Sequence, residues 1–152
     1  MTIDVGDRAP AFRLTSDDGA KVALGDFKGR KLVVYFYPKA FTPGCTTQAC
    51  DLRDDYGRFI AAGYAVVGIS PDAPDKLARF RKEYRLPFPL LADTDHAVAA
   101  AYGAWGTKKN FGREYQGIIR STFVIDGSGV VTEAWYNVKA SGHIDRLLRQ
   151  LG

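Results

Sequence analysis

The chain has 152 residues, of which 46% are hydrophobic and 25% charged, and its formal net charge is +4 at pH 7. This length and composition predict one globular domain over residues 1–152 with a single substantial core. The basic and acidic residues are interspersed along the chain and no apolar run approaches the roughly 20 residues of a membrane span, which argues against a nucleic-acid-binding or membrane protein.

The first half of the chain predicts a hairpin followed by a strand, a helix and a second strand. Residues 12–24 carry apolar residues on both sides of the turn at 17–19, which predicts a hairpin at the edge of a sheet. The run LVVYFY over residues 32–37 is typical of a strand buried on both faces. Helical spacing of apolar residues over 49–60 and the apolar run YAVVGIS over 64–70 then predict a parallel crossover.

The second half of the chain predicts three helices and three strands. In chain order these are a surface helix over 75–85, a short strand over 88–92, a short alanine-rich helix over 95–102, an antiparallel hairpin of strands 121–125 and 130–136, and a terminal helix. Ser141 is the expected N-cap of this last helix, which carries Leu147 and Leu148. The elements together predict an α/β fold with a central mixed β-sheet flanked by helices.

The segment Pro38–Cys50, PKAFTPGCTTQAC, lies where the first buried strand meets a helix, which is the place where open α/β sheets form their sites. In a first helical turn, Cys45 faces unpaired backbone N–H groups and the positive end of the helix dipole, and both favour the thiolate. Thr42 can place its hydroxyl beside the sulfur, and Pro38 and Pro43 stiffen the loop. The alternative is that Thr42 only caps the helix and Cys45 is a small buried hydrophobe.

Cys50 is the second cysteine of the chain. Ideal helix geometry separates the Cα atoms of Cys45 and Cys50 by about 8.6 Å, beyond the roughly 7 Å that a disulfide tolerates, so a disulfide requires the first turns to unwind. No C-x-x-C motif is present, and His96 and His143 lie in unrelated segments, where we expect surface or cap residues rather than metal ligands. Because the opening MTIDVGDRAP lacks a secretion signal, we expect redox chemistry in the cytoplasm.

A thiolate needs a fixed cation as its partner, and Arg120 is the candidate because the buried strand over 121–125 anchors its backbone. The alternative is a solvated arginine. A binding or holdase role is the alternative from another class, because an exposed aromatic surface could be formed by Phe41, Trp105 and Phe111. We favour the rim of the site or the core as the place of these rings. A thiol-disulfide reductase is a further alternative function, closer in chemistry to the redox role than a binding protein.

Pro38, Thr42 and Cys45 together fit the pattern P-x-x-x-T-x-x-C, by which the chain resembles the peroxiredoxins. Cys50, five residues further on, resembles the resolving cysteine of the PrxQ or bacterioferritin comigratory protein subfamily. The similarity covers nearly the whole chain, including the stretches GDRAPAFRL, VVYFYP, VVGIS, LPFPLLAD and YGAWGTKKNFGREYQGIIRSTFVID. It implies a thioredoxin-like fold.

The resemblance also implies a thiol peroxidase that needs no metal, haem or flavin, and we expect a monomer. In such an enzyme the Cys45 thiolate attacks a hydroperoxide and becomes a sulfenic acid, while Thr42 and Arg120 orient the peroxide. Cys50 then closes a disulfide, which a thioredoxin or glutaredoxin-like dithiol reduces. The chain departs from many relatives at Gln48, where they carry a glutamate, so the hydrogen bonding near Cys45 stays open.

Overall fold

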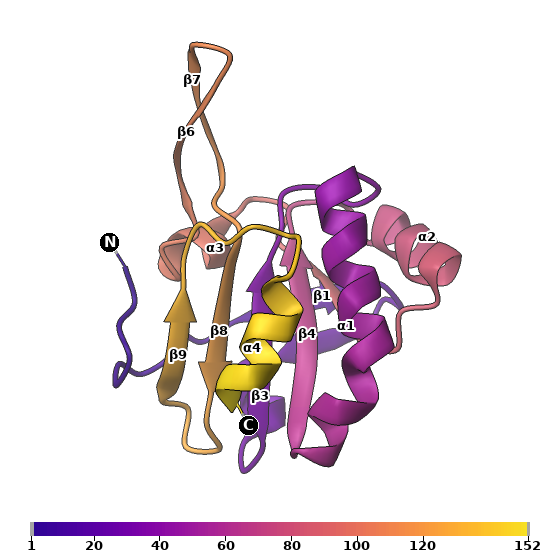
Figure 1. The fold of residues 1–152 in the computed structure, drawn as a ribbon, viewed down its shortest axis with the longest axis vertical. Helices are drawn as coiled ribbons and strands as arrows, with labels where there is room; N and C mark the ends of the chain where they lie inside the picture. The colour runs from indigo at the N-terminus through magenta and orange to yellow at the C-terminus, as the bar shows by residue number, and fades with distance from the viewer. Residues whose placement is uncertain (1, 152) are drawn as a thin grey trace.

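The computed structural model describes residues 2–151. Within them, seven strands form one mixed sheet in the order β2-β1-β5-β4-β3-β8-β9, and β6 and β7 pair separately (Figure 1). The strands of the large sheet are β1 (Arg13–Ser16), β2 (Lys21–Ala23), β3 (Lys31–Phe36), β4 (Tyr64–Ser70), β5 (Leu90–Ala92), β8 (Ser121–Ile125) and β9 (Val131–Trp135). The helices are η1 (Leu24–Phe27, a 3₁₀ turn), α1 (Pro43–Ala61), α2 (Pro74–Tyr84), α3 (Ala97–Ala101) and α4 (His143–Leu151). None of these helices is long and apolar enough to cross a membrane.

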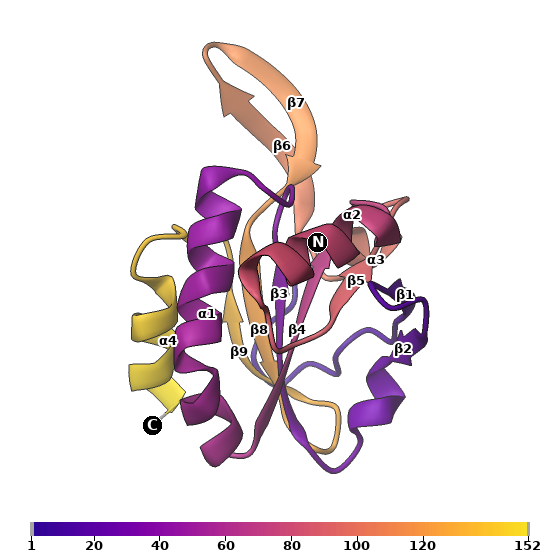
Figure 2. The same ribbon diagram turned by 90° about the vertical axis from the view of Figure 1, so that its right-hand side faces the viewer.

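The centre of the sheet is parallel and its two sides are antiparallel. β3 pairs in parallel with β4, and β4 with β5, whereas the β1–β2 hairpin and the β8–β9 hairpin extend the sheet in antiparallel fashion. The predicted N-terminal hairpin, the crossover through α1 and the later hairpin are therefore confirmed. Figure 2 shows that α1 begins at the end of the sheet where the chain leaves the carboxyl end of β3.

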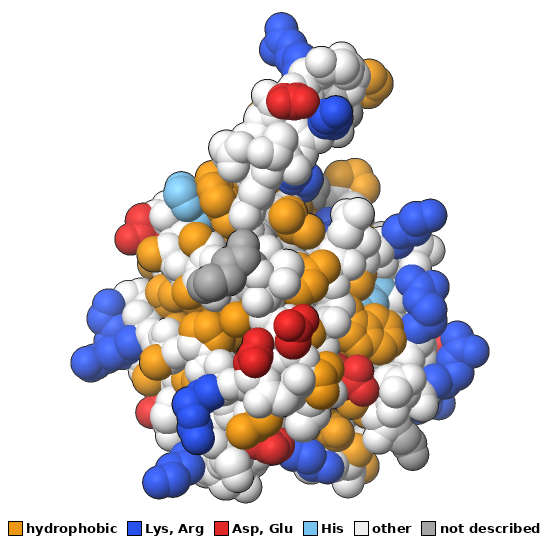
Figure 3. All heavy atoms as spheres, turned by 90° about the vertical axis from the view of Figure 1, so that its left-hand side faces the viewer, with side chains coloured by type: hydrophobic (Ala, Val, Ile, Leu, Met, Phe, Trp, Pro, Cys, Tyr) orange, Lys and Arg blue, Asp and Glu red, His pale blue; other side chains and the backbone are white. Residues whose placement is uncertain are grey.

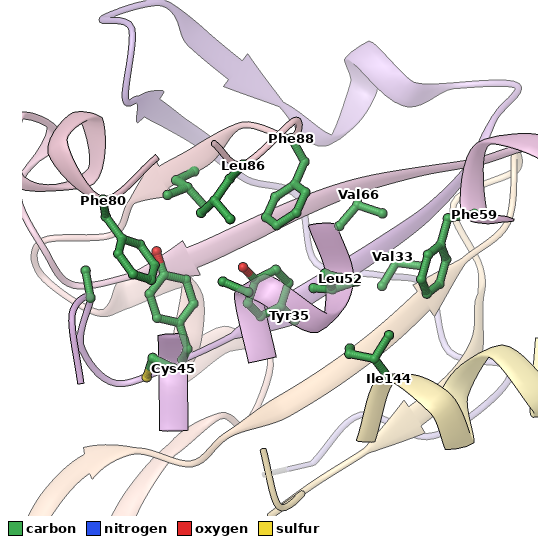
Figure 4. Packing of buried hydrophobic residues seen from close by; sticks show 14 of the residues in the cluster. Val33, Tyr35, Cys45, Leu52, Phe59, Val66, Phe80, Leu86, Phe88 and Ile144 are labelled. Carbon is green, nitrogen blue, oxygen red and sulfur yellow. The ribbon is translucent and has the colours of Figure 1, made fainter. Parts of the chain in front are cut away.

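The sheet separates two apolar cores, because side chains of a strand point alternately to opposite faces. Val33 and Tyr35 of β3 point into the first core, which α1, α2 and α4 close (Figure 4). Leu32 and Val34 point into the second, which also holds Ala99 of α3. Burial on both faces accounts for the continuous apolar run in this strand.

Two further strands, β6 (Trp105–Asn110) and β7 (Arg113–Ile118), form a hairpin that the apolar pattern does not predict. This β6–β7 arm stands clear of the body, and Figure 3 shows basic and acidic side chains near its end. Phe111 and Gly112 have φ values of 52° and 77°, and a positive φ at both positions is typical of a tight type I′ turn. Phe111 is 98% exposed. Since the arm buries little, its sequence needs no alternation of apolar and polar residues.

The start of α1 and the cap of α4 differ from the predictions. α1 begins at Pro43, six residues before the helical spacing of apolar residues that starts at position 49, and it has 19 residues. In α4 the Gly142 carbonyl accepts the N–H of Arg146 at 3.2 Å, so Gly142 is the N-cap and the prediction of Ser141 was wrong by one residue.

Candidate active site

The loop over residues 38–42, between β3 and α1, is fixed by its neighbours. The backbone N–H of Ala40 donates to Asp72 Oδ2 at 2.8 Å. Phe41 has a left-handed φ of 70° and packs its ring on Phe80, with 5.1 Å between the centroids. A positive φ at a non-glycine residue costs about 1 kcal/mol or more, so these contacts hold the loop in a shape that it would otherwise leave.

Thr42 is the N-cap of α1, where its carbonyl accepts the N–H of Thr46 at 2.9 Å. Its side chain does not cap the helix, because Oγ1 donates to the Lys39 carbonyl at 2.7 Å. Among the hydrogen bonds of residues 2–151 there is none between this hydroxyl and the Cys45 sulfur. The hydroxyl keeps its acceptor lone pairs for another donor.

Cys45 occupies the third position of α1 and is 1% exposed. Figure 4 shows it at one end of the first core, and its thiol is free. At this position the sulfur is close to the first-turn amides, which have no partners within the helix. Burial alone would also suit a small hydrophobic residue, so the polar contacts of the sulfur decide between the two interpretations.

Arg120 supplies the decisive contact, from a residue 75 positions away in the chain. Its Nη2 donates to Cys45 Sγ at 3.2 Å, and its Nη1 donates to Gln48 Oε1 at 2.5 Å. The guanidinium thus bridges two residues of one helical turn. Gly44 leaves room for it, since a Cβ at this position would lie 3.2 Å from Arg120 Nη2.

Gln48 is fully buried, and its contact with Arg120 could not be inferred from the sequence, which showed only a departure from relatives. An amide accepts the guanidinium hydrogen bond without cancelling its charge. Its Nε2 has no hydrogen-bond partner among the described residues. The positive charge of Arg120 is therefore left to the sulfur.

Cys50 lies one turn and a half beyond Cys45 on the continuous α1 helix and is half-buried, with a free thiol. Beside it, Arg53 donates to the Tyr84 carbonyl at 2.9 Å and so ties this face of α1 to α2. Cys50 faces solvent only in part. The two sulfurs cannot form a disulfide while the helix stays intact, because the Cα atoms of residues 45 and 50 are about 8.6 Å apart in an ideal helix.

Two tyrosines, one in β3 and one directly after it, share the core with Cys45, although the sequence assigned both only to the strand. The rings of Tyr35 and Tyr37 stack with 5.3 Å between their centroids. Burial raises the pKa of both phenols, so they stay protonated at neutral pH. They therefore add apolar surface beside the sulfur and no charge.

A pocket of about 600 Å³ opens beside Arg120, between the base of the β6–β7 arm and the connection from β9 to α4. Its lining includes Pro38, Lys108, Ile119, Arg120, Tyr136 and Val138. The sequence gave no sign of this pocket, because its walls come from five separate segments of the chain.

The two histidines have different surroundings, and neither contacts Cys45 by a hydrogen bond among the described residues. His96 stacks on Trp105 with 3.7 Å between the ring centroids. His143 is fully buried, and its Nε2 lies 2.8 Å from Thr122 Oγ1, so its expected place at the surface or at a helix cap was wrong. Among residues 2–151, no group of three or more His, Cys, Asp or Glu side chains could hold a metal ion.

Of the three aromatic residues expected at a rim, in the core or on a binding surface, Phe41 and Trp105 pack against neighbouring rings. Phe111 alone stands free in solvent, at the end of the arm.

A cysteine in the first turn of a helix, held by an arginine and followed by a second cysteine, defines a cysteine-based redox enzyme on an α/β sheet. Residues 5–134 match the AhpC/TSA family. A Mycobacterium tuberculosis protein is 57% identical over 146 residues, which cover 96% of this chain and 93% of that protein. Peroxiredoxin Bcp of Bacillus subtilis is 46% identical over 151 residues, which cover 99% of this chain and 96% of that protein.

Comparison with solved structures gives the same result as comparison of sequences. PrxQ of Xylella fastidiosa superposes with a TM-score of 0.93 at 29% identity, covering 99% of this chain and 96% of that chain. Peroxiredoxin Q of Xanthomonas campestris superposes with a TM-score of 0.87 at 36% identity, covering 92% and 89%. The chain belongs to the AhpC/TSA family. It is a peroxiredoxin of the Bcp and PrxQ type, a thiol peroxidase with a thioredoxin-like fold, as the resemblance of its sequence implied.

Proposed function

We propose that this peroxidase reduces hydrogen peroxide and organic hydroperoxides with Cys45 as its nucleophile. The observation that carries this assignment is the 3.2 Å contact between Arg120 Nη2 and Cys45 Sγ. A guanidinium in contact with sulfur favours the thiolate, and its N–H groups can stabilise charge that develops on the two peroxide oxygens. A Xanthomonas campestris relative has been studied for its alkyl peroxide reduction activity, which supports organic hydroperoxides as substrates.

In the first step the Cys45 thiolate attacks the terminal peroxide oxygen. The S–O bond forms as the O–O bond breaks, which gives a sulfenic acid and an alkoxide or hydroxide that leaves as alcohol or water after taking a proton. Arg120 stabilises the leaving oxygen. Thr42, whose own proton points to the Lys39 carbonyl, accepts the O–H of the peroxide, and Pro38 forms the wall of the pocket beside Arg120.

In the second step the Cys50 thiol attacks the sulfenic sulfur, releasing water and closing a disulfide. Because the two Cα atoms are about 8.6 Å apart in a helix, the first turns of α1 must unwind for this bond to form. A thioredoxin or glutaredoxin-like dithiol then reduces the disulfide, and the helix re-forms.

The setting of this reaction is also a proposal. Cys45, Gln48, Cys50 and Arg120 come from one chain, so the site is complete in a monomer, with residues 1–152 as one domain. The cycle requires a reducing environment and a dithiol partner, which supports a cytoplasmic antioxidant role.

Steady-state peroxide reduction coupled to thioredoxin, thioredoxin reductase and NADPH tests the assignment. Cys45→Ser should abolish peroxide consumption. Cys50→Ser should still consume one equivalent of peroxide per reduced chain but lose thioredoxin-driven turnover. A Cys45→Ser protein with undiminished activity would remove Cys45 from the mechanism, and a Cys50→Ser protein with full turnover would remove Cys50.

A further inference from the structure

Phe41 lies at the surface, between the start of α1 and the helix α2. Its ring is 43% exposed, and its buried part packs on Phe80 and Tyr84, with 5.1 and 6.2 Å between the ring centroids. The backbone of Phe41 has a left-handed φ of 70°, which glycine or asparagine adopts at lower cost. An aromatic ring is therefore kept at this position against the preference of its backbone. Aromatic residues are enriched where another protein binds.

Basic side chains surround the exposed part of this ring. A hollow of about 550 Å³ opens beside it, lined by Phe41 and by four exposed charged residues of α2 and its C-terminal end, namely Arg79, Lys82, Glu83 and Arg85. The three cations of this set have no carboxylate within 4 Å among the described residues, whereas Arg81 of the same helix pairs with Asp17 at 3.1 Å. Three cations and one carboxylate leave two positive charges, and we call Phe41 and these four residues the basic α2 surface.

Cys50 lies next to the basic α2 surface. Arg53 follows Cys50 by three positions on the same side of α1, and its Nη1 donates to the Tyr84 carbonyl at 2.9 Å. Figure 1 shows α2 beside the first half of α1. The ring of Tyr84 also contacts the ring of Phe41. A protein that approaches the Cys50 sulfur from solvent over the α1–α2 contact therefore meets the basic α2 surface.

We propose that the dithiol reductant binds on the basic α2 surface, and that this surface selects a reductant with acidic residues around its thiols. The Phe41 ring packs on apolar surface beside the dithiol of the partner, while the cations attract its carboxylates. The inference rests on the proposed function, because it names the partner that completes the same cycle.

The position of the surface also assigns the sulfur that is attacked. The first thiolate of the reductant attacks Cys50 Sγ, and the Cys45 sulfur leaves as a thiolate, because Arg120 stabilises that thiolate. The second thiol of the reductant then loses its proton and attacks the mixed disulfide, which releases Cys50 as a thiolate that takes up a proton. The reductant ends as a disulfide and has given two electrons to the chain.

Single-turnover reduction of the disulfide form tests the inference. The chain is oxidised with one equivalent of hydrogen peroxide and mixed with an excess of either dithiothreitol, a small neutral dithiol, or a reduced thioredoxin that carries acidic residues around its dithiol. Acid quenching and alkylation of the thiols measure the rate constant. Arg79→Glu/Lys82→Glu should slow reduction by thioredoxin about tenfold, because attraction becomes repulsion. Its rate constant with dithiothreitol should equal that of the parent.

Lys28→Glu/Arg30→Glu is the matched control, because it makes the same change of charge at two exposed residues. They precede the amino end of β3, whereas Phe41 follows its carboxyl end. The control should keep the thioredoxin rate within about twofold of the parent, since salt screens distant charges. An equal loss in both double variants would mean long-range attraction without a binding surface and would overturn the inference.

Phe41→Asn tests the aromatic part of the surface, because asparagine tolerates the left-handed backbone and removes the ring. The ratio of the thioredoxin rate to the dithiothreitol rate should fall about fivefold. An unchanged ratio in Phe41→Asn and in Arg79→Glu/Lys82→Glu would place the reductant elsewhere, while the disulfide itself would still form and be reduced. If peroxide produced no disulfide in the parent, it would be the proposed function that fails.

Discussion

At the scale of single residues, the site depends on one guanidinium that binds two acceptors of different charge. Arg120 contacts the Cys45 sulfur, which can become an anion, and the Gln48 amide, which cannot. A carboxylate at position 48 would hold the arginine more firmly but would also place a negative charge one turn from the sulfur. The amide fixes the arginine and leaves its charge to the thiolate.

Gln48→Glu should therefore weaken the nucleophile. The added carboxylate competes for Arg120 and repels the thiolate, so the thiolate absorbance at 240 nm should fall at neutral pH and the rate constant with hydrogen peroxide should drop about threefold or more. Gln48→Met is the control, since it removes the acceptor without adding charge. An equal or faster rate in Gln48→Glu would show that holding the arginine matters more than its net charge.

A second prediction at this scale concerns the stability of the protein at acid pH, and it depends on His143. Burial, followed by the charges of Arg146 and Arg120, lowers the pKa of His143 from 6.5 to about 4. Between these values the unfolded chain binds a proton that the folded chain does not, so the folded state loses up to about 3 kcal/mol as the pH falls from 6.5 to 4.

Urea unfolding across this pH range measures the loss. His143→Gln keeps an amide near Thr122 and should flatten the pH dependence relative to the parent. His96→Gln, which changes the histidine stacked on Trp105, should leave the slope unaltered. If the parent and His143→Gln lose stability in parallel, carboxylates and not His143 govern the acid response.

At the scale of elements, the start of α1 has few of the features that stabilise a helix terminus. Its first turn has no acidic residue, the Thr42 side chain does not cap it, and Gly44 lowers its helical propensity. What holds this turn is the burial of Cys45 and Ala49 together with the Arg120 bonds. Because these stabilising features are missing, the first-turn amides are free to interact with a thiolate. For the same reason the turn is easy to unwind.

Oxidation should accordingly release the first turns of α1 and no more. Hydrogen exchange at the amides of residues 46–54 should be faster in the disulfide form than in the reduced form, because unwinding opens their helical hydrogen bonds. The amides of residues 55–61 should stay protected. Cys50→Ser treated with the same oxidant cannot close the bond and serves as the control. Equal protection in both redox states would contradict a disulfide that requires unwinding.

At the scale of the whole molecule, burial decides what the sequence could predict. The central strands are covered on both faces, so their apolar runs indicated the sheet. Only Trp105 and Ile118, at the base of the β6–β7 arm, contribute to a core, so the rest of the arm left no such pattern. In the site, the motif indicated Cys45 and Thr42, but the partners of Arg120, which lie 72 and 75 positions away in the chain, depend on tertiary contacts that no local pattern records.

The same coupling between site and fold predicts an oxidised protein that is less stable than the reduced one. A disulfide that closes the short ring 45–50 restricts the unfolded chain by only about 2 kcal/mol. In the folded state, closing the disulfide removes the burial of Cys45 and Ala49. It also breaks the hydrogen bonds from Arg120 to Cys45 and Gln48, and a hydrogen bond to a charged group is worth about 1.5–3 kcal/mol. The loss exceeds the gain, so the urea midpoint of diamide-oxidised protein should lie below that of reduced protein, while Cys50→Ser shows no difference. A higher midpoint after oxidation would mean that the bond forms within an intact fold.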